Sequence, residues 1–174
     1  MRTLVLGGAR SGKSAHAEGL LGDGRVDYLA TGRRKPDDPE WEARIAAHVA
    51  RRPPNWRTVE DVDLPAALRT AGPVPVLVDD LATWLTGELD DAGAWAGGWD
   101  EILACRARCA ELVAAVVACP ARLVLVSAEV GLGVVPATPA GRLFRDELGA
   151  FNAELAAVCE QVLLLVAGLP VRLR

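Results

Sequence analysis

Short apolar runs recur along the 174-residue chain. Within each run the residues are continuously apolar, rather than apolar at every second position. This pattern is typical of strands in a parallel sheet that is covered on both faces. We therefore expect strands at residues 3–6, 26–30, 74–79, 123–127 and 162–166, with shorter candidates at 56–59 and 171–173.

The segments between these runs are compatible with helices. Strands that alternate with helices predict an α/β fold with right-handed crossovers. The length suits one core, and no repeat or long linker divides the chain, so we expect residues 1–174 to form a single domain. The predicted helices span residues 13–21, 39–51, 64–70, 81–89, 99–118 and 140–160.

Between the first strand and the first helix lies the octapeptide Gly-Gly-Ala-Arg-Ser-Gly-Lys-Ser. It fits the phosphate-loop pattern, in which a glycine and four further residues precede Gly-Lys-Ser. Glycines let the backbone turn tightly and point its N–H groups at phosphate oxygens. A plain glycine-rich turn is the alternative, but the position between strand and helix favours nucleotide binding. The residues predicted to hold phosphate are Gly7, Gly8, Ala9, Arg10, Ser11, Gly12, Lys13 and Ser14.

A phosphate loop usually needs an acidic partner for Mg²⁺ at the end of a neighbouring strand. Asp79 ends the apolar run 74–79, and Asp80 follows it directly. We predict that Ser14 and Asp79 provide oxygen ligands for Mg²⁺. An aspartate at a strand-to-helix turn also caps a helix well, and Asp80 suits that role better.

The chain contains two histidines. His16 falls just inside the first helix, and we expect it on the helix surface. His48 lies in an Arg-rich amphipathic segment, where the local sequence alone favours a structural or solvated role.

Two further polar features lie near the end of the 123–127 strand and beyond it. Glu129 precedes a loop rich in Gly and Pro, and it is either an active-site carboxylate or an ordinary loop acid. Arg142 and Asp146 are four residues apart on a predicted helix, where such a pair contributes only a few tenths of a kcal/mol.

Composition excludes several classes of protein. The net charge is −4 and the arginines are scattered, so we expect no nucleic acid partner. The residues before the phosphate loop are too few for a signal peptide, and no apolar run approaches about 20 residues. We therefore expect a cytoplasmic protein without a membrane span. The cysteines, which lack metal-ligand spacing, are predicted to be small buried thiols at positions 105, 109, 119 and 159.

Several longer motifs accompany the phosphate loop in a fixed order. Arg44-Ile45-x-x-His48 is followed by Trp56-x-Thr58-x-Glu60, and later by Glu129-Val130-Gly131 and Val134-Val135-Pro136. Shorter motifs are Tyr28-Leu29-Ala30-Thr31, Thr83-Trp84-Leu85-Thr86 and Ala167-Gly168-Leu169-Pro170. Together they resemble the bifunctional adenosylcobinamide kinase / adenosylcobinamide-phosphate guanylyltransferases of cobalamin assembly, over essentially the whole chain.

The resemblance implies a RecA-like phosphate-loop fold, a homotrimer and two reactions that use ATP or GTP with Mg²⁺. In the first, a nucleoside triphosphate gives its γ-phosphoryl group to the aminopropanol hydroxyl of adenosylcobinamide. In the second, GTP gives its GMP unit to that phosphate, which releases pyrophosphate and leaves adenosylcobinamide-GDP.

The resemblance also implies roles for individual residues. The second reaction of the family passes through GMP bound covalently to a histidine, which matches His48. A neutral imidazole, with a reference pKa of about 6.5, can attack phosphorus without a strong base. Lys13 would neutralise phosphate charge. The nucleotide contacts that carry over beyond the phosphate loop are Ala30, Thr31, Gly32, Val49, Ala50, Arg51, Arg52, Glu60 and Asp79.

The chain departs from the family pattern at a few positions. Ala128 stands where the family usually carries Asn, so one polar contact is lost there. Val49 and Ala50 replace a more polar pair and can contribute only backbone groups. The charged run 33–36 either steers a phosphate or is a solvated loop, and the loop is favoured.

Three other functions fit parts of the sequence. A phosphate-loop kinase of another small molecule would form no covalent nucleotide on the protein. A regulatory ATPase would hydrolyse nucleotide slowly and need a protein partner. A kinase-only relative would have lost the second reaction, although the presence of His48 weighs against it.

Overall fold

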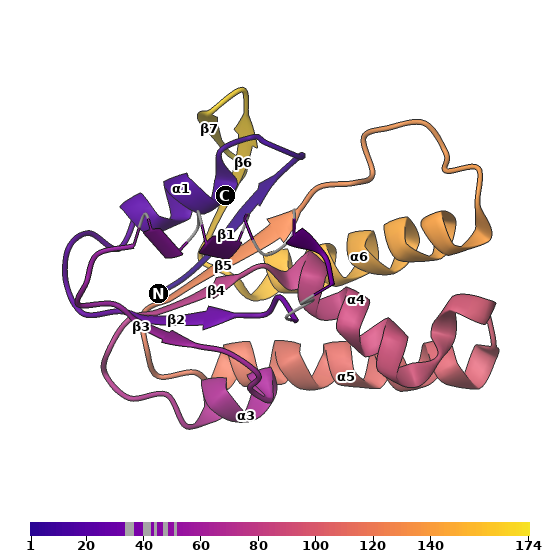
Figure 1. Cartoon of the computed structure of the whole chain (residues 1–174), viewed down its shortest axis with the longest axis horizontal. Coiled ribbons are helices and arrows are strands. Elements are labelled where there is room, and N and C mark those ends of the chain that lie inside the picture. The colour runs from indigo at the N-terminus through magenta and orange to yellow at the C-terminus, as the bar shows by residue number, and fades with distance from the viewer. Residues whose placement is uncertain (34–36, 40–42, 44, 47–48, 51) are drawn as a thin grey trace.

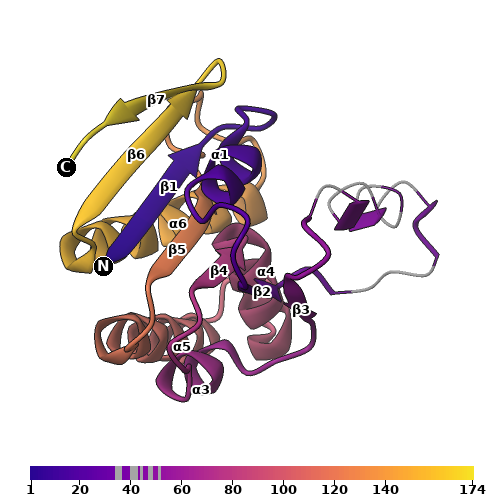
Figure 2. The same cartoon turned by 90° about the vertical axis from the view of Figure 1, so that its left-hand side faces the viewer.

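The computed structural model describes residues 1–33, 37–39, 43, 45–46, 49–50 and 52–174. Within these residues, one seven-stranded sheet has the order β3-β2-β4-β5-β1-β6-β7. Figure 2 shows β3 near one edge and the β6–β7 hairpin at the other. The strands are β1 (Arg2–Gly7), β2 (Asp27–Ala30), β3 (Arg57–Val59), β4 (Val76–Asp79), β5 (Leu123–Ala128), β6 (Gln161–Val166) and β7 (Leu169–Arg172).

The sheet is parallel except for its last pair. β1 pairs in parallel with both β5 and β6, and β2 pairs in parallel with both β3 and β4. β7 returns antiparallel to β6 through a tight turn. The carboxyl ends of the parallel strands therefore meet at one edge, where ligands bind in open α/β sheets.

Helices cover both faces of the sheet (Figure 1). Residues of β1 alternate between the two sides: Leu4 packs in the cluster beneath α4, α5 and α6, whereas Val5 packs with Ala17 of α1. This double covering explains why the strands are continuously apolar. The helices are α1 (Lys13–Gly19), α3 (Leu64–Arg69), α4 (Leu81–Ala92), α5 (Trp99–Ala118) and α6 (Pro139–Val158), with a 3₁₀ turn, η1, at Ala94–Ala96.

Most predicted elements are confirmed, and the differences have local causes. α4 continues past residue 89 to Ala92, where Gly93 at φ 68° ends it in the left-handed conformation. α6 stops before residue 160, because the Glu160 N–H already donates to the Arg2 carbonyl at 3.0 Å. The strand expected at 171–173 begins earlier, at Leu169. The predicted helix 39–51 lies largely outside the described residues.

The prediction that the cysteines are buried thiols is confirmed for three of the four. Cys105, Cys109 and Cys159 are buried, and Cys119 is half-buried. Among the described residues, no helix is both long and apolar enough to cross a membrane.

Candidate functional site

The phosphate loop joins β1 to α1, and its shape depends on two glycines. A Cβ atom at Gly7 would lie 2.3 Å from Ser11 Oγ, so any larger residue would displace the Ser11 side chain from the loop. Gly12 precedes the helix at φ 86°, a left-handed conformation that glycine adopts without strain. No side chain caps α1, whose residues are all described, so its first N–H groups are available to a ligand.

The turn between β6 and β7 is hydrogen-bonded to the phosphate loop. The Gly168 N–H donates to the Ser11 carbonyl at 3.1 Å. The turn is built from Ala167 at φ 51° and Gly168 at φ 82°. Its Ala-Gly pair was part of the sequence resemblance, but the contact with the phosphate loop was not predicted.

Asp79 lies at the carboxyl end of β4, beside the phosphate loop. Ser14 Oγ donates to Asp79 Oδ1 at 3.1 Å, and the Tyr28 hydroxyl donates to Asp79 Oδ2 at 2.5 Å. Burial raises the pKa of the Tyr28 phenol, and the negative charge of Asp79 adds to the rise. The phenol therefore remains a hydrogen-bond donor, and it fixes the orientation of the carboxylate.

Arg52 closes the other side of Tyr28. Its guanidinium carbon lies 3.4 Å from the centre of the Tyr28 ring, in a cation–π contact. Arg52 Nη1 also donates to Thr58 Oγ1 at 2.8 Å. A positive charge is thus held at the pocket wall by contacts from β2 and β3.

Asp80 caps α4, as the sequence predicted. The Thr83 N–H donates to Asp80 Oδ1 at 2.7 Å. Burial and the neighbouring charge of Asp79 raise the pKa of the Asp80 carboxyl, whereas the hydrogen bond from Thr83 opposes the rise. The Thr31 hydroxyl donates to the Asp80 carbonyl at 2.6 Å, which ties the end of β2 to the same turn.

A pocket of about 400 Å³ opens over the phosphate loop. Of the predicted nucleotide residues, Gly7, Gly8 and Ala9 form the first part of the loop and do not line this pocket. Val49 and Ala50 are exposed, and they do not line it either. His48 and Arg51 lie outside the described residues. The predicted residues that do line it are Arg10, Ser11, Gly12, Lys13, Ser14, Ala30, Gly32, Arg52, Glu60 and Asp79.

Some lining residues were not predicted. Tyr28 lies in the buried strand β2, where the sequence predicts a core residue. In the structure its hydroxyl donates a hydrogen bond to Asp79, and the residue lines the pocket. Thr83 is one turn into α4 and reaches the pocket only because Asp80 caps that helix. Thr31 was predicted at the nucleotide, but it lines a neighbouring pocket instead.

The remaining candidates lie elsewhere. Glu129 Oε1 accepts the Gly131 N–H at 2.6 Å, as a loop acid does, and it does not line the nucleotide pocket. Arg142 donates to the Pro136 and Ala137 carbonyls, and Asp146 pairs with Arg145. Arg142 and Asp146 therefore make other contacts than the expected pair with one another. His16 is half-buried on α1 rather than fully at its surface.

The pocket offers what a triphosphate needs. Lys13 and Arg52 supply positive charge, and the loop supplies backbone N–H groups. The hydroxyl of Ser14 and the carboxylate of Asp79 are hard oxygen donors that touch one another, and such donors fit Mg²⁺.

Comparison with known proteins extends this picture. The model of the family "Cobinamide kinase / cobinamide phosphate guanyltransferase" matches residues 3–173. The chain is 43% identical over 181 residues to the bifunctional adenosylcobalamin biosynthesis protein CobP of Pseudomonas aeruginosa, covering 100% of this chain and 98% of that protein. It is 42% identical over 183 residues to the corresponding CobU proteins of Escherichia coli and Salmonella typhimurium, with 100% of each chain covered.

A solved structure supports the fold. An ATPase from the type III secretion system of pathogenic bacteria superimposes with a TM-score of 0.50 at 13% identity. The match covers 95% of this chain and 51% of the ATPase chain, and at 13% identity it supports a shared fold and nothing more. The predicted RecA-like α/β fold is confirmed by this likeness and by the mostly parallel sheet. The match over residues 3–173 and the full-length identity together show that the chain belongs to the cobinamide kinase / cobinamide phosphate guanyltransferase family.

Proposed function

We propose that this chain is a bifunctional enzyme of adenosylcobalamin biosynthesis, in which one nucleotide-binding domain over residues 1–174 carries out both reactions. The observation that carries the proposal is the meeting of Lys13, Ser14 and Asp79 at one pocket, in a member of this family. The enzyme phosphorylates adenosylcobinamide and then transfers GMP to the product.

In the first reaction, the hydroxyl oxygen of adenosylcobinamide forms a bond to the γ-phosphorus of ATP or GTP. The bond between that phosphorus and the β–γ bridging oxygen breaks, the hydroxyl proton passes to water, and the nucleoside diphosphate leaves. Such transfers depend mainly on positioning and on neutralising charge. Lys13 and the backbone of the phosphate loop are suited to both tasks.

In the second reaction, an imidazole nitrogen of His48 forms a bond to the α-phosphorus of GTP, and pyrophosphate leaves. An oxygen of adenosylcobinamide phosphate then attacks the same phosphorus, and the P–N bond breaks to restore the histidine. Dividing one displacement into two steps is the usual benefit of a covalent intermediate. The assignment of His48 rests on the resemblance and on imidazole chemistry.

Around these groups, other residues position the nucleotide. Glu60 and the backbone at Ala30 and Gly32 line the pocket and would contact the nucleoside or its phosphates. Arg52, already held by Tyr28 and Thr58, would offset negative charge on the phosphates. The remaining proposed contacts are Thr31, Arg51 and the backbone of Val49 and Ala50.

Ser14 and Asp79 are the proposed ligands of Mg²⁺. When bound, the ion would neutralise charge on the phosphate oxygens. The direct contact between these two side chains supports their assignment to one site. We further propose a cytoplasmic homotrimer with no nucleic acid partner, as the family resemblance and the charge distribution suggest.

Labelling with GTP tests the proposal. The protein is incubated with α-labelled GTP and Mg²⁺, denatured and freed of unbound nucleotide. We expect label on the wild type and on H16A, which removes the other histidine, but none on H48A. The label should be lost in acid and kept in base, as a phosphoramidate requires.

Other outcomes point to the competing functions. Equal label on wild type and H48A excludes the proposed nucleophile. Phosphorylation of adenosylcobinamide without any covalent label indicates a kinase alone. Hydrolysis of nucleotide with neither phosphorylation nor label indicates a regulatory ATPase.

A further inference from the structure

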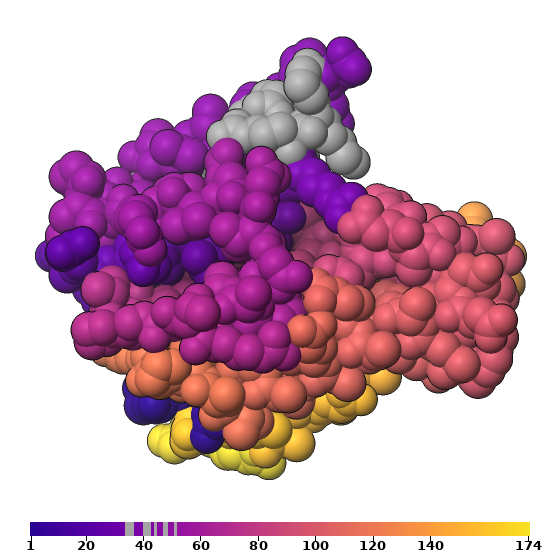
Figure 3. All heavy atoms as spheres, turned by 90° about the horizontal axis from the view of Figure 1, so that it is seen from below, coloured from indigo at the N-terminus to yellow at the C-terminus, as the bar shows by residue number. Residues whose placement is uncertain are grey.

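A second pocket of about 360 Å³ adjoins the nucleotide pocket. Ala30, at the carboxyl end of β2, lines both. α4 also connects them, because Thr83 faces the nucleotide pocket whereas Trp84 and Gly87 line the second. The segment after β2, the start of α3 and α4 all contribute residues to the second pocket. Figure 3 shows the side of the molecule on which these segments lie. A molecule in the second pocket would therefore lie next to the bound nucleotide.

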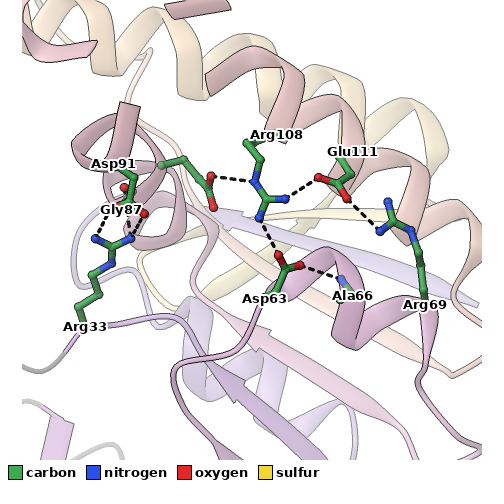
Figure 4. Close-up of polar contacts among 9 residues, drawn as sticks. Arg33, Asp63, Ala66, Arg69, Gly87, Asp91, Arg108 and Glu111 are labelled. Atoms are coloured by element: carbon green, nitrogen blue, oxygen red, sulfur yellow. Dashed lines mark hydrogen bonds and ion pairs between the residues drawn. The ribbon is translucent and has the colours of Figure 1, made fainter. Parts of the chain in front are cut away.

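Ion pairs build the wall of the second pocket (Figure 4). Arg108 of α5 contacts Glu88 at 3.0 Å and Asp63 at 3.2 Å. The Arg33 guanidinium pairs with Asp91 at 2.5 Å and donates to the Gly87 carbonyl at 3.3 Å. These contacts join α4 to α5, to the segment before α3 and to the segment after β2.

The charge of this wall limits the ligand. Carboxylates outnumber guanidinium groups among the lining residues, so a second phosphate group is disfavoured. The described residues contain no group of three His, Cys, Asp or Glu side chains arranged for a metal ion. Paired carboxylates keep lone pairs that accept hydrogen bonds from neutral hydroxyl and amide groups. The charged lining residues are Arg33, Asp61, Asp63, Glu88, Asp91 and Arg108.

Trp84 provides a further observation. Only 7% of this residue is exposed, and it lines the second pocket. Its ring packs against Phe151 at 5.5 Å between centroids. Trp84 thus gives the second pocket an apolar wall beside its charged residues.

We propose that the second pocket binds the hydroxyl-bearing amide arm of the corrinoid acceptor, with the macrocycle outside. This inference rests on the proposed function and deepens it. A cavity of about 360 Å³ holds a short neutral arm but not a whole corrin ring. From there the arm reaches across Ala30 toward the γ-phosphate over Lys13. The carboxylates supply hydrogen-bond acceptors for the hydroxyl and amide N–H groups of the arm, and Trp84 supplies an apolar surface for its carbon atoms.

Gly87 offers a sharp test because it is buried on α4 at the pocket wall. A Cβ atom there would lie 3.0 Å from a guanidinium nitrogen of Arg33. That side-chain end can move, and alanine is the better helix former, so G87A should fold. The added methyl narrows the pocket and displaces Arg33 from its position. The matched control is G149A on α6, where an added Cβ meets nothing within 4 Å.

Two measurements are made on wild type, G87A and G149A. The first is equilibrium binding of adenosylcobinamide to the nucleotide-loaded protein, and the second is the KM of each substrate in phosphorylation. We expect G87A to weaken acceptor binding and raise the acceptor KM about tenfold, as one methyl group in a pocket can, while nucleotide KM stays within about twofold. G149A should match the wild type.

A second variant tests the apolar wall. W84F keeps an aromatic ring against Phe151 but shortens the side chain that lines the pocket, and we expect about fivefold weaker acceptor binding. Unchanged acceptor binding in both G87A and W84F overturns the inference, as does a parallel loss of nucleotide affinity in G87A. Binding is measured without turnover, so it tests the second pocket independently of the reaction. If the wild type binds the acceptor but does not phosphorylate it, the proposed function is wrong and not the assignment of the pocket.

Discussion

Ser14 Oγ lies 3.1 Å from Asp79 Oδ1, although the two residues are 65 positions apart in the chain. Ser14 lies in the first turn of α1 and Asp79 ends β4, so the packing of this helix on the sheet brings them together. The Tyr28 hydroxyl holds the second oxygen of the same carboxylate. The proposed Mg²⁺ ligands are therefore arranged before any ligand binds, which reduces the cost of ordering them on binding.

Removing the negative charge of Asp79 should weaken Mg²⁺ binding more than it destabilises the fold. In D79N the amide keeps the size of the side chain but loses its negative charge. We expect kcat/KM for phosphorylation to fall about a hundredfold and the Mg²⁺ concentration for half-maximal rate to rise, in line with the several kcal/mol that metal ions contribute. Initial rates across a Mg²⁺ titration measure both quantities. D100N, at an exposed aspartate of α5, is the control, and equal rates in D79N and D100N would exclude Asp79 as a ligand.

The turn between β6 and β7 should control nucleotide affinity through the phosphate loop. Gly168 has φ 82°, and its N–H donates to Ser11. Asparagine tolerates this conformation, whereas the β-branched valine does not. We expect G168V to raise the nucleotide KM about tenfold and G168N to stay near the wild type, since backbone strain of this kind costs about 1–3 kcal/mol.

Nucleotide titrations of both variants measure this effect. G72A is the control, because an added Cβ at Gly72 meets nothing within 4 Å and its φ is not positive. If G168V binds nucleotide as tightly as G168N, the turn does not position the loop.

Acid should weaken the link between the chain start and β6. Hydrogen bonds from Arg2 lower the pKa of Glu160 to about 2. Because this value lies below the unfolded value of about 4.3, the pair stabilises the fold above that pH. The contribution is lost as pH falls from about 4.3 toward 2. Both side chains are partly exposed, so we expect a modest effect.

Urea unfolding at pH 7 and pH 3 measures this dependence. E160Q should be less stable than the wild type at pH 7, and the difference should shrink at pH 3. A difference of the same size at both pH values would show that the Glu160 charge does not contribute.

Contiguous signals predicted the centre of the site. The phosphate loop is one octapeptide, and Asp79 ends an apolar run, so both could be recognised along the chain. Tyr28 and Trp84 belong to motifs of the resemblance, but neither was predicted at a pocket. Each lies in an apolar segment, and its place at a pocket depends on how distant elements pack.

The sheet, like the site, could be predicted only in part from the sequence. Strands followed from continuously apolar runs and most helices from the segments between them, but the order β3-β2-β4-β5-β1-β6-β7 depends on pairing between strands distant in sequence. The place of Glu129 also depended on tertiary structure. Glu129 does not line the nucleotide pocket, and this depends on how β5 and the loop after it pack rather than on the local sequence.

The most direct measurement of the central claim is a chase of the labelled protein. Wild-type protein is first labelled from α-labelled GTP, so that it carries labelled GMP, and unbound GTP is removed. The labelled protein is then mixed rapidly with adenosylcobinamide phosphate. The account predicts that the label moves from the protein to adenosylcobinamide-GDP, at least as fast as steady-state turnover. Label that stays on the protein, or that moves more slowly than turnover, would contradict a guanylylated intermediate.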